Sequence, residues 1–302
     1  MPSADKGLIS IVIPTYNRPE SLCRLLDSIK AQKTTQKMEV LVIDGSPLCP
    51  TRPLRKRYGW VRFIAEGREQ SLSDMRNTGI AKAKGSKVFL VDDDNKLDAN
   101  CVQALANALD QSQNIGMAVP YMYYLTKPNV LWSNGSMIGK HLLTPFALTN
   151  KVDTGEFEVM RVDTAPNAFM LSRQAIQEVG YFDTANFPIH HAEADYGLRL
   201  RKAGFMCVAV PKAKTWHDIG YEKRFGLDIR NDKRAYNIMF GEVMLRKKWQ
   251  RGFWQHAEPF IILGVMLFIT LRSPYVPLKA KLHYMRKAIK GYRDAKRARL
   301  IE

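Results

Sequence analysis

Three consecutive aspartates, Asp92, Asp93 and Asp94, directly follow the apolar run KVFLV at residues 87–91. Like charges at this spacing repel, and each ionised carboxylate raises the pKa of its neighbours. Such a cluster is typical of a cation site, because Mg²⁺ binds one or two carboxylates together with phosphate oxygens and water. Alternate residues of a turn can point the same way, so Asp92 and Asp94 can share one ion. The alternative is that one or two of the aspartates cap the helix that follows.

A second acidic group, Glu193 and Asp195, lies at the predicted start of a helix in the segment HHAEADYG. A carboxylate there can act as a general base that deprotonates a hydroxyl nucleophile. The alternative is plain stabilisation of the helix N-terminus, which favours anions. His217, in the segment TWHDIG, can complete a metal site through its neutral imidazole, or it can pack as an ordinary structural histidine.

The first 120 residues, which must position the aspartates, alternate apolar strands with amphipathic helices. This alternation is typical of an open, doubly wound parallel sheet, which binds ligands beyond the carboxyl ends of its strands. Later segments predict two more helices and a last strand. We expect strands over 8–14, 39–44, 61–65, 87–91, 116–122 and 205–211, and helices from Pro19 and over 70–84, 98–112, 172–180 and 190–204.

Polar residues follow three of the expected strands, so they should gather at one edge of the sheet. Residues 15–18 (TYNR) follow the first strand, Asp44 ends the second, and the three aspartates follow the fourth. Asp44 can bond the edge of a nucleotide base or close an Asx turn with Gly45. Arg76 can steady a nucleotide or the acidic edge, or it can be an ordinary surface arginine. The sequence predicts a nucleotide site at this edge.

The chain of 302 residues carries a formal net charge of +17, which indicates an anionic partner. Residues 272–302 hold ten Lys or Arg and two Asp or Glu, so much of the excess lies in the tail. The wholly apolar run at 259–271 is shorter than the ~20 residues of a membrane span. Followed by a basic amphipathic helix, it favours attachment to an anionic membrane surface, peripherally or by shallow insertion. The alternative is a buried helix followed by a solvated one.

Several other classes of protein are disfavoured by the absence of their motifs. No G-x-G-x-x-G follows the first strand, and neither a P-loop nor a G-x-S-x-G motif occurs. No pattern of alternating aromatic and basic residues supports nucleic-acid binding. The four cysteines are scattered, which indicates reduced thiols, and the N-terminus does not read as a signal peptide. We therefore expect a protein at the cytoplasmic face of the cell membrane.

The segments SIVIPTYNRPESLCRLLDSI, VLVIDGS, MRNTGIAKAKGSKVFLVDDD and AEADYGLRLRKAGF occur in the order in which the family 2 inverting glycosyltransferases carry such motifs. The chain resembles this family over about residues 8–220, and most closely its rhamnosyltransferase-like members. The resemblance implies an α/β GT-A fold, Rossmann-like with a mostly parallel central sheet. It further implies a catalytic domain over 1–220, with a nucleotide-binding half (1–122) and an acceptor-side half (123–220). Residues 221–302 would form a helical, membrane-associating extension.

The resemblance also assigns roles to single residues. Asp94 and His217 would hold Mg²⁺ or Mn²⁺ at the diphosphate, and Glu193 would be the catalytic base, with Asp195 as the alternative base. The implied substrates are a nucleotide-diphosphate sugar as donor and a hydroxyl of a glycan or lipid-linked glycan as acceptor. The residues expected to hold the nucleotide sugar are Pro14, Thr15, Tyr16, Arg18, Asp44, Arg76, Asp92 and Asp93.

Two alternatives to this function stay open. A polyprenyl-phosphate sugar synthase would use an acceptor that is already ionised and would have little need of a base. A catalytically inactive, membrane-binding homologue is a third candidate, which the intact acidic residues disfavour. Donor sugar, acceptor and oligomeric state are left open by the sequence.

Overall fold

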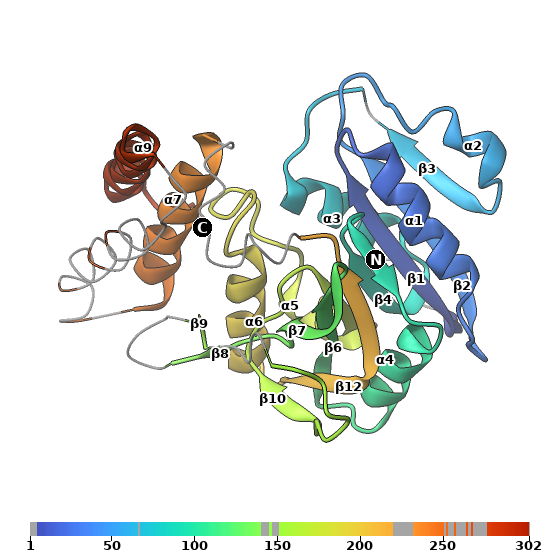
Figure 1. The fold of residues 1–302 in the computed structure, drawn as a ribbon. Helices are drawn as coiled ribbons and strands as arrows, with labels where there is room; N and C mark the ends of the chain where they lie inside the picture. Colours follow the sequence, from blue (N-terminus) through green and yellow to red (C-terminus); the bar gives the residue numbers. More distant parts are fainter. Residues whose placement is uncertain are drawn as a thin grey trace.

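The computed structural model describes residues 5–65, 67–139, 145–146, 151–219, 232–250 and 277–301, with residues 252, 257, 264 and 267. A central sheet is covered by helices, and two helices stand beside it (Figure 1). The first elements are β1 (Asp5–Thr15), α1 (Pro19–Lys30), β2 (Lys37–Asp44), α2 (Leu54–Arg57), β3 (Val61–Ala65), α3 (Leu72–Lys82), β4 (Gly85–Val91), β5 (Asn95–Leu97), α4 (Cys101–Asp110) and β6 (Ile115–Tyr124). They are followed by β7 (Lys127–Ser133), β8 (Met137–Ile138), β9 (Pro145–Phe146), β10 (Met160–Val162), β11 (Ala168–Ser172), α5 (Arg173–Val179), α6 (Ala192–Lys202), β12 (Met206–His217), α7 (Asp232–Trp249) and α9 (Leu278–Arg297).

The main sheet has the strand order β10-β12-β6-β11-β4-β1-β2-β3 among the described residues. β1 pairs in parallel with β2 and β4, and its apolar residues 9 and 11–13 are fully buried, as expected for an inner strand covered on both faces. The predicted α/β fold is confirmed. The sheet is nevertheless mixed, because β11 lies antiparallel between β4 and β6. This insertion places the segment before β11 beside the aspartates that follow β4.

The helices follow the apolar periodicity of the sequence. α1 begins at Pro19, whose fixed φ suits the first helical turn, and buries its apolar face. In α3, Gly79 faces Val12 of β1, so this helix packs directly on β1, the strand that residues 15–18 follow. β12 is longer than the predicted strand over 205–211. It passes a register shift between Val210 and Lys214 and carries His217 to the carboxyl end of the sheet.

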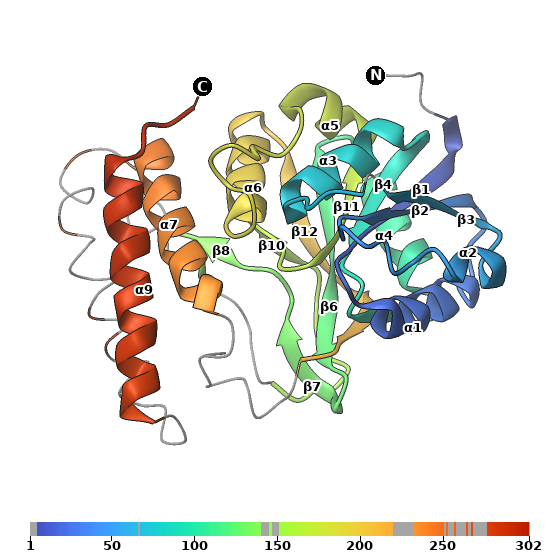
Figure 2. The same cartoon turned by 90° about the horizontal axis from the view of Figure 1, so that it is seen from above.

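The C-terminal helices α7 and α9 pack along one another, with α7 between α9 and α6 (Figure 2). Small residues on α9 permit this approach, and a Cβ on Gly291 would meet the backbone carbonyl of Tyr236 in α7. The segment 253–271 and its predicted membrane insertion lie outside the described residues, apart from single positions. Within the described part of the chain, no helix combines the length and the apolar character of a membrane span.

Candidate active site

The three aspartates lie at the carboxyl end of β4, next to a cavity of about 580 Å³. Asp92 and Asp94 line it, together with Glu193 and His217. A neighbouring cavity of about 450 Å³ is lined by Pro14, Thr15, Tyr16, Arg18 and Asp92. A larger cavity of about 810 Å³ between α4 and β12 contains none of these residues. The predicted site residues therefore converge on these two cavities, apart from Asp44, Arg76, Asp93 and Asp195, which line neither of them.

The cations beside the aspartates are two arginines of the chain itself. Arg18, just after β1, lies 2.6 Å from Asp93 and 2.7 Å from Asp94. Arg76, from α3, lies 3.0 Å from Asp92. Each aspartate of the cluster is therefore paired with a guanidinium group, Asp93 and Asp94 with Arg18 and Asp92 with Arg76. The repulsion inherent in three adjacent carboxylates is offset in this way.

Burial and pairing separate the aspartates electrostatically. Burial raises the pKa of Asp93 to about 7, against the opposing charge of Arg18 and the 2.6 Å hydrogen bond donated by Thr15. Burial also opposes ionisation of Asp94, but His217 and Arg18 outweigh it and hold the pKa of Asp94 at about 2. Asp94 is therefore the carboxylate best prepared to stay ionised toward the cavity, whereas Asp93 is turned into the protein.

Arg76 joins the two acidic motifs that the sequence places 101 residues apart. Its guanidinium contacts Asp92 at 3.0 Å and Glu193 at 2.5 Å, and the whole residue is buried. The rings of Phe169 and Phe182 lie 5.6 and 5.8 Å from it, in the range of cation–π contacts. Burial raises the pKa of Asp92 to about 6 in spite of the Arg76 charge. Arg76 is therefore an internal cation that fixes both carboxylates, and the alternative of a surface arginine is wrong.

The two candidate bases are placed differently. Glu193 lines the cavity, and its side chain is 12% exposed. Asp195 is fully buried and faces α7, where Trp249 donates a 2.8 Å hydrogen bond to its Oδ1. Both carboxylates lie in the first turn of α6, so the turn of the helix directs them to different sides. This placement favours Glu193 as the base and indicates a structural role for Asp195.

Asp44 is occupied by its own loop. The backbone N–H of Ser46 donates to one carboxylate oxygen at 2.9 Å, and the hydroxyl of Thr51 donates to the other at 2.6 Å. The residue is 1% exposed, which agrees with the Asx-turn interpretation. A contact between Asp44 and a nucleotide base stays a prediction. Tyr16, by contrast, is 37% exposed at the edge of the smaller cavity, and its ring is accessible to a ligand.

Asp94 and His217 form a pair that is suited to a divalent cation. His217 Nε2 lies 3.5 Å from Asp94 Oδ1, and that oxygen and His217 Nδ1 are buried without a hydrogen-bond partner among the described residues. Within the same residues, no cluster of three or more acidic, histidine or cysteine side chains is arranged for a metal. Two protein ligands nevertheless agree with the way Mg²⁺ is held, with phosphate oxygens and water completing the shell.

Sequence patterns missed further lining residues, four of which come from β7, α7 and α9. Arg234 and Ile238 of α7 and Tyr284 of α9 border the same cavity as Asp94, and Trp132 of β7 packs against His217 with ring centroids 4.3 Å apart and ring planes 53° apart. The C-terminal helices carry no motif, and their periodicity indicates packing faces but not what they pack against. The order of elements alone therefore does not place Arg234 at the site.

Comparison with known structures and proteins identifies the class. The fold matches the crystal structure of GalNAc-T7 with UDP, GalNAc and Mn²⁺ with a TM-score of 0.64 at 16% identity, over 97% of this chain and 55% of that one. This likeness shows a GT-A-like α/β fold. The chain belongs to glycosyl transferase family 2, whose model matches residues 10–180.

Several relatives agree with this assignment. The uncharacterized glycosyltransferase YwdF of Bacillus subtilis is 28% identical over 64% of this chain and 68% of its own length. Chondroitin synthase of Escherichia coli is 23% identical over 89% of this chain, which spans 42% of that relative. The galactofuranosyltransferase GlfT2 of Mycobacterium tuberculosis is 22% identical over 75% of this chain and 40% of its own length.

Replacing Arg76 by Met is expected to lower the free energy of unfolding by about 3–5 kcal/mol, because Asp92 and Glu193 would lose their buried counter-charge. Equilibrium unfolding in urea measures the change. Arg57→Met is the control, since Arg57 is 60% exposed in its ion pair with Asp27 and its loss should cost less than about 1 kcal/mol. Equal losses in the two variants would contradict the role assigned to Arg76.

Proposed function

We propose that the protein transfers a sugar from a nucleoside-diphosphate sugar to a hydroxyl of a glycan or lipid-linked glycan, with inversion at the anomeric carbon. One observation carries the proposal. A single cavity contains Asp94 beside His217, and Asp92 linked through Arg76 to Glu193. A nucleotide held at the strand ends would thus lie next to a carboxylate that can accept a proton.

The donor part of the proposed site lies among the charged residues after β1 and β4. Asp92 would face the ribose, and the residues around Thr15 and Tyr16 would enclose the nucleotide. Mg²⁺ or Mn²⁺ held by Asp94 and His217 would neutralise charge on the leaving nucleoside diphosphate. Arg234, which lines both cavities, adds a positive charge to them.

The acceptor end depends on Glu193. Its carboxylate takes the proton from the acceptor hydroxyl, and the oxygen attacks the anomeric carbon opposite the phosphate. The bond from that carbon to the phosphate oxygen breaks, and the nucleoside diphosphate leaves with the electron pair. One displacement inverts the configuration without a covalent intermediate on the enzyme. Arg76 fixes the direction of the Glu193 carboxylate, which must point at the acceptor for the transfer to occur.

The relatives support the donor class but do not identify the sugar. The structure of GalNAc-T7 contains UDP and Mn²⁺, and chondroitin synthase and GlfT2 are named as glycan-building enzymes. The rhamnosyltransferase-like specificity stays a prediction, so activated rhamnose belongs in any panel of donors. An oligomer stays open.

The reaction is tested with a panel of nucleotide sugars and Mn²⁺, in which at least one donor should be hydrolysed or used for transfer. Asp94→Asn should lower that turnover by roughly a hundredfold or more, because the cation and its charge stabilisation are lost. Asp98→Asn is the matched control, since Asp98 Oδ1 accepts the backbone N–H of Asn100 in the turn before α4 and lies outside the cavity. Full turnover in Asp94→Asn would refute the metal role.

The role of the base separates hydroxyl transfer from the polyprenyl-phosphate alternative. Glu193→Gln should reduce transfer to a hydroxyl by roughly a hundredfold to ten-thousandfold, the usual contribution of a general base. A phosphate acceptor is already ionised, and turnover with it would survive this change. Glu178→Gln, at an exposed position of α5, is the control. A wild-type protein without turnover on any donor would favour the inactive membrane-binding homologue.

We also propose that residues 221–302 attach the catalytic domain, residues 1–220, to an anionic membrane at the cytoplasmic face. Exposed Arg286, Arg293 and Arg297 recur at helical spacing on α9, and Leu278 and Leu282 are 69% and 53% exposed near its start. The opposite face of α9, including Tyr284, is buried. One face of α9 therefore packs on α7, and the opposite, basic face is the one proposed to bind the membrane.

Charge reversal tests the attachment without removing the helix. Changing Arg286, Arg293 and Arg297 to Glu should weaken sedimentation with phosphatidylglycerol vesicles by at least roughly a hundredfold, at about 1 kcal/mol for each basic residue at the surface. The control reverses three exposed charges of the opposite end of the molecule, Arg52, Arg55 and Lys56. Similar binding by the α9 variant and the wild type would refute the proposal.

A further inference from the structure

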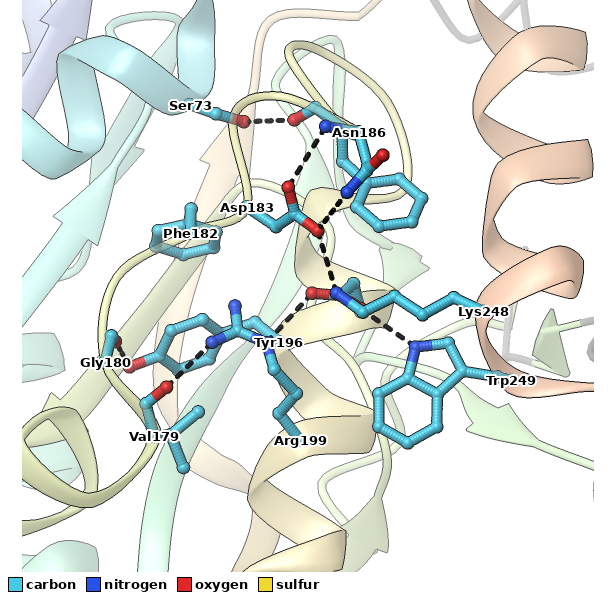
Figure 3. A network of polar contacts seen from close by, with 12 residues as sticks. Ser73, Val179, Gly180, Phe182, Asp183, Asn186, Tyr196, Arg199, Lys248 and Trp249 are labelled. Carbon is cyan, nitrogen blue, oxygen red and sulfur yellow. Dashed lines mark hydrogen bonds and ion pairs between the residues drawn. The ribbon is translucent and has the colours of Figure 1, made fainter. Parts of the chain in front are cut away.

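The first turn of α6, which carries Glu193, is held from its other side by α7. Asp195 Oδ1 accepts a hydrogen bond from Trp249 Nε1 at 2.8 Å and forms an ion pair with Lys248 Nζ at 2.9 Å, while Arg199 Nε donates to Oδ2 at 2.9 Å. These three partners, Trp249, Lys248 and Arg199, are labelled in Figure 3. The Asp195 carboxylate is fully buried, so these donors replace water around it. A fully buried carboxylate with three donors is costly to disturb, and it fixes the backbone two residues beyond Glu193.

A second contact fixes the backbone before Glu193. His191 adopts a left-handed conformation, with φ of 65°, as the residue before the helix, and its side chain makes no capping hydrogen bond. Such a conformation persists where the surroundings determine it. α7 supplies those surroundings: a Cβ on Gly241 would come within 2.9 Å of the His190 carbonyl oxygen, and Glu242 lies 3.4 Å from the His191 ring.

The loop that leads into α6 is tied to the same helix. Lys248 also contacts Asp183 at 2.8 Å, and Asp183 accepts a 2.8 Å hydrogen bond from Asn186 (Figure 3). Asn186 in turn exchanges two hydrogen bonds with the backbone of Ile301 near the end of the chain. Helix α7 thus contacts the loop at Asp183, the His190–His191 turn and the first turn of α6. The segment after α9 holds the same loop through Asn186.

We propose that α7 is a brace that positions the catalytic carboxylate. Trp249 and Lys248, acting through Asp195, and Gly241, acting on the His190–His191 turn, set the backbone from which Glu193 reaches the acceptor. Arg76 orients the Glu193 carboxylate, and α7 fixes the backbone that carries it. Trp249 and Lys248 are positioning residues, and the inference rests on the proposed role of Glu193 as base.

A neighbouring residue separates positioning from general stabilisation. Lys247 also joins α7 to another element, but its ammonium donates to the carbonyls of Ala295, Lys296 and Ala298 at the end of α9, away from α6. Lys247→Met therefore loosens the helical pair without touching Asp195. Trp249→Phe keeps an aromatic ring and removes the N–H donor, and Lys248→Met removes the ammonium group.

The experiment compares Trp249→Phe, Lys248→Met and Lys247→Met by hydrogen exchange and by kinetics. In the first two variants, the amides of residues 192–196 should exchange roughly tenfold faster, as expected from the loss of one hydrogen bond to a charged group. Turnover should fall by roughly tenfold to a hundredfold, because a displaced base loses its alignment, while KM for the donor and binding of the nucleoside diphosphate with Mn²⁺ stay unchanged. Lys247→Met should show neither effect.

Each outcome decides between the two roles. Unchanged exchange at 192–196 in both Trp249→Phe and Lys248→Met, or faster exchange with full turnover, would overturn the brace. An equal loss of turnover in Lys247→Met would mean that α7 only stabilises the protein in general, and this result would also overturn the proposal. If the wild type turns over no nucleotide sugar, the proposed reaction fails, and the exchange arm alone then decides whether α7 fixes the first turn of α6.

Discussion

Three adjacent carboxylates can stand at the end of β4 only because two arginines of the chain neutralise them, Arg76 from the interior and Arg18 from the surface. Arg18 pairs with Asp93 and Asp94, and Arg76 pairs with Asp92. Both arginines come from elements that pack against β4 or its neighbour β1, so the ion pairs form only when the sheet and α3 are in place. Buried charges without partners are strongly destabilising, so the three aspartates are tolerated at the end of β4 only in the folded protein.

The same constraint explains how distant parts of the chain meet at the cavity. The antiparallel strand β11 lies between β4 and β6, and the carbonyl of Asn167 just before it accepts the backbone N–H of Asp92. β12 runs parallel to β6 and delivers His217 to the same edge. Arg76 pairs with both Asp92 and Glu193, so one buried guanidinium connects the acidic end of β4 to the first turn of α6.

Local patterns in the sequence predicted the elements but not their long-range partners. Strands such as β1 and helices such as α1 follow from apolar runs and periodicity, because those signals depend on neighbours in the chain. The sequence predicted Arg76 as a nucleotide-binding residue, with an ordinary surface arginine as the alternative, because nothing near it in sequence reveals its pairing with Glu193. The choice between Glu193 and Asp195 required α7, which buries one carboxylate and leaves the other at the cavity. Spacing within one helical turn was insufficient to decide it.

Charge balance shows why the site suits an anionic donor accompanied by a cation. Counted as ionised, the cluster and Glu193 contribute four negative charges, against two from Arg18 and Arg76. A diphosphate would add further negative charge beside Asp92, which is unfavourable unless positive charge enters with it. A divalent cation held by Asp94 and His217 would offset this excess, and Arg234 of α7 lines the same cavity. The family 2 match ends at residue 180, and Arg234 lies beyond it. Helix α7 therefore also contributes charge to the cavity that Asp92 and Asp94 line.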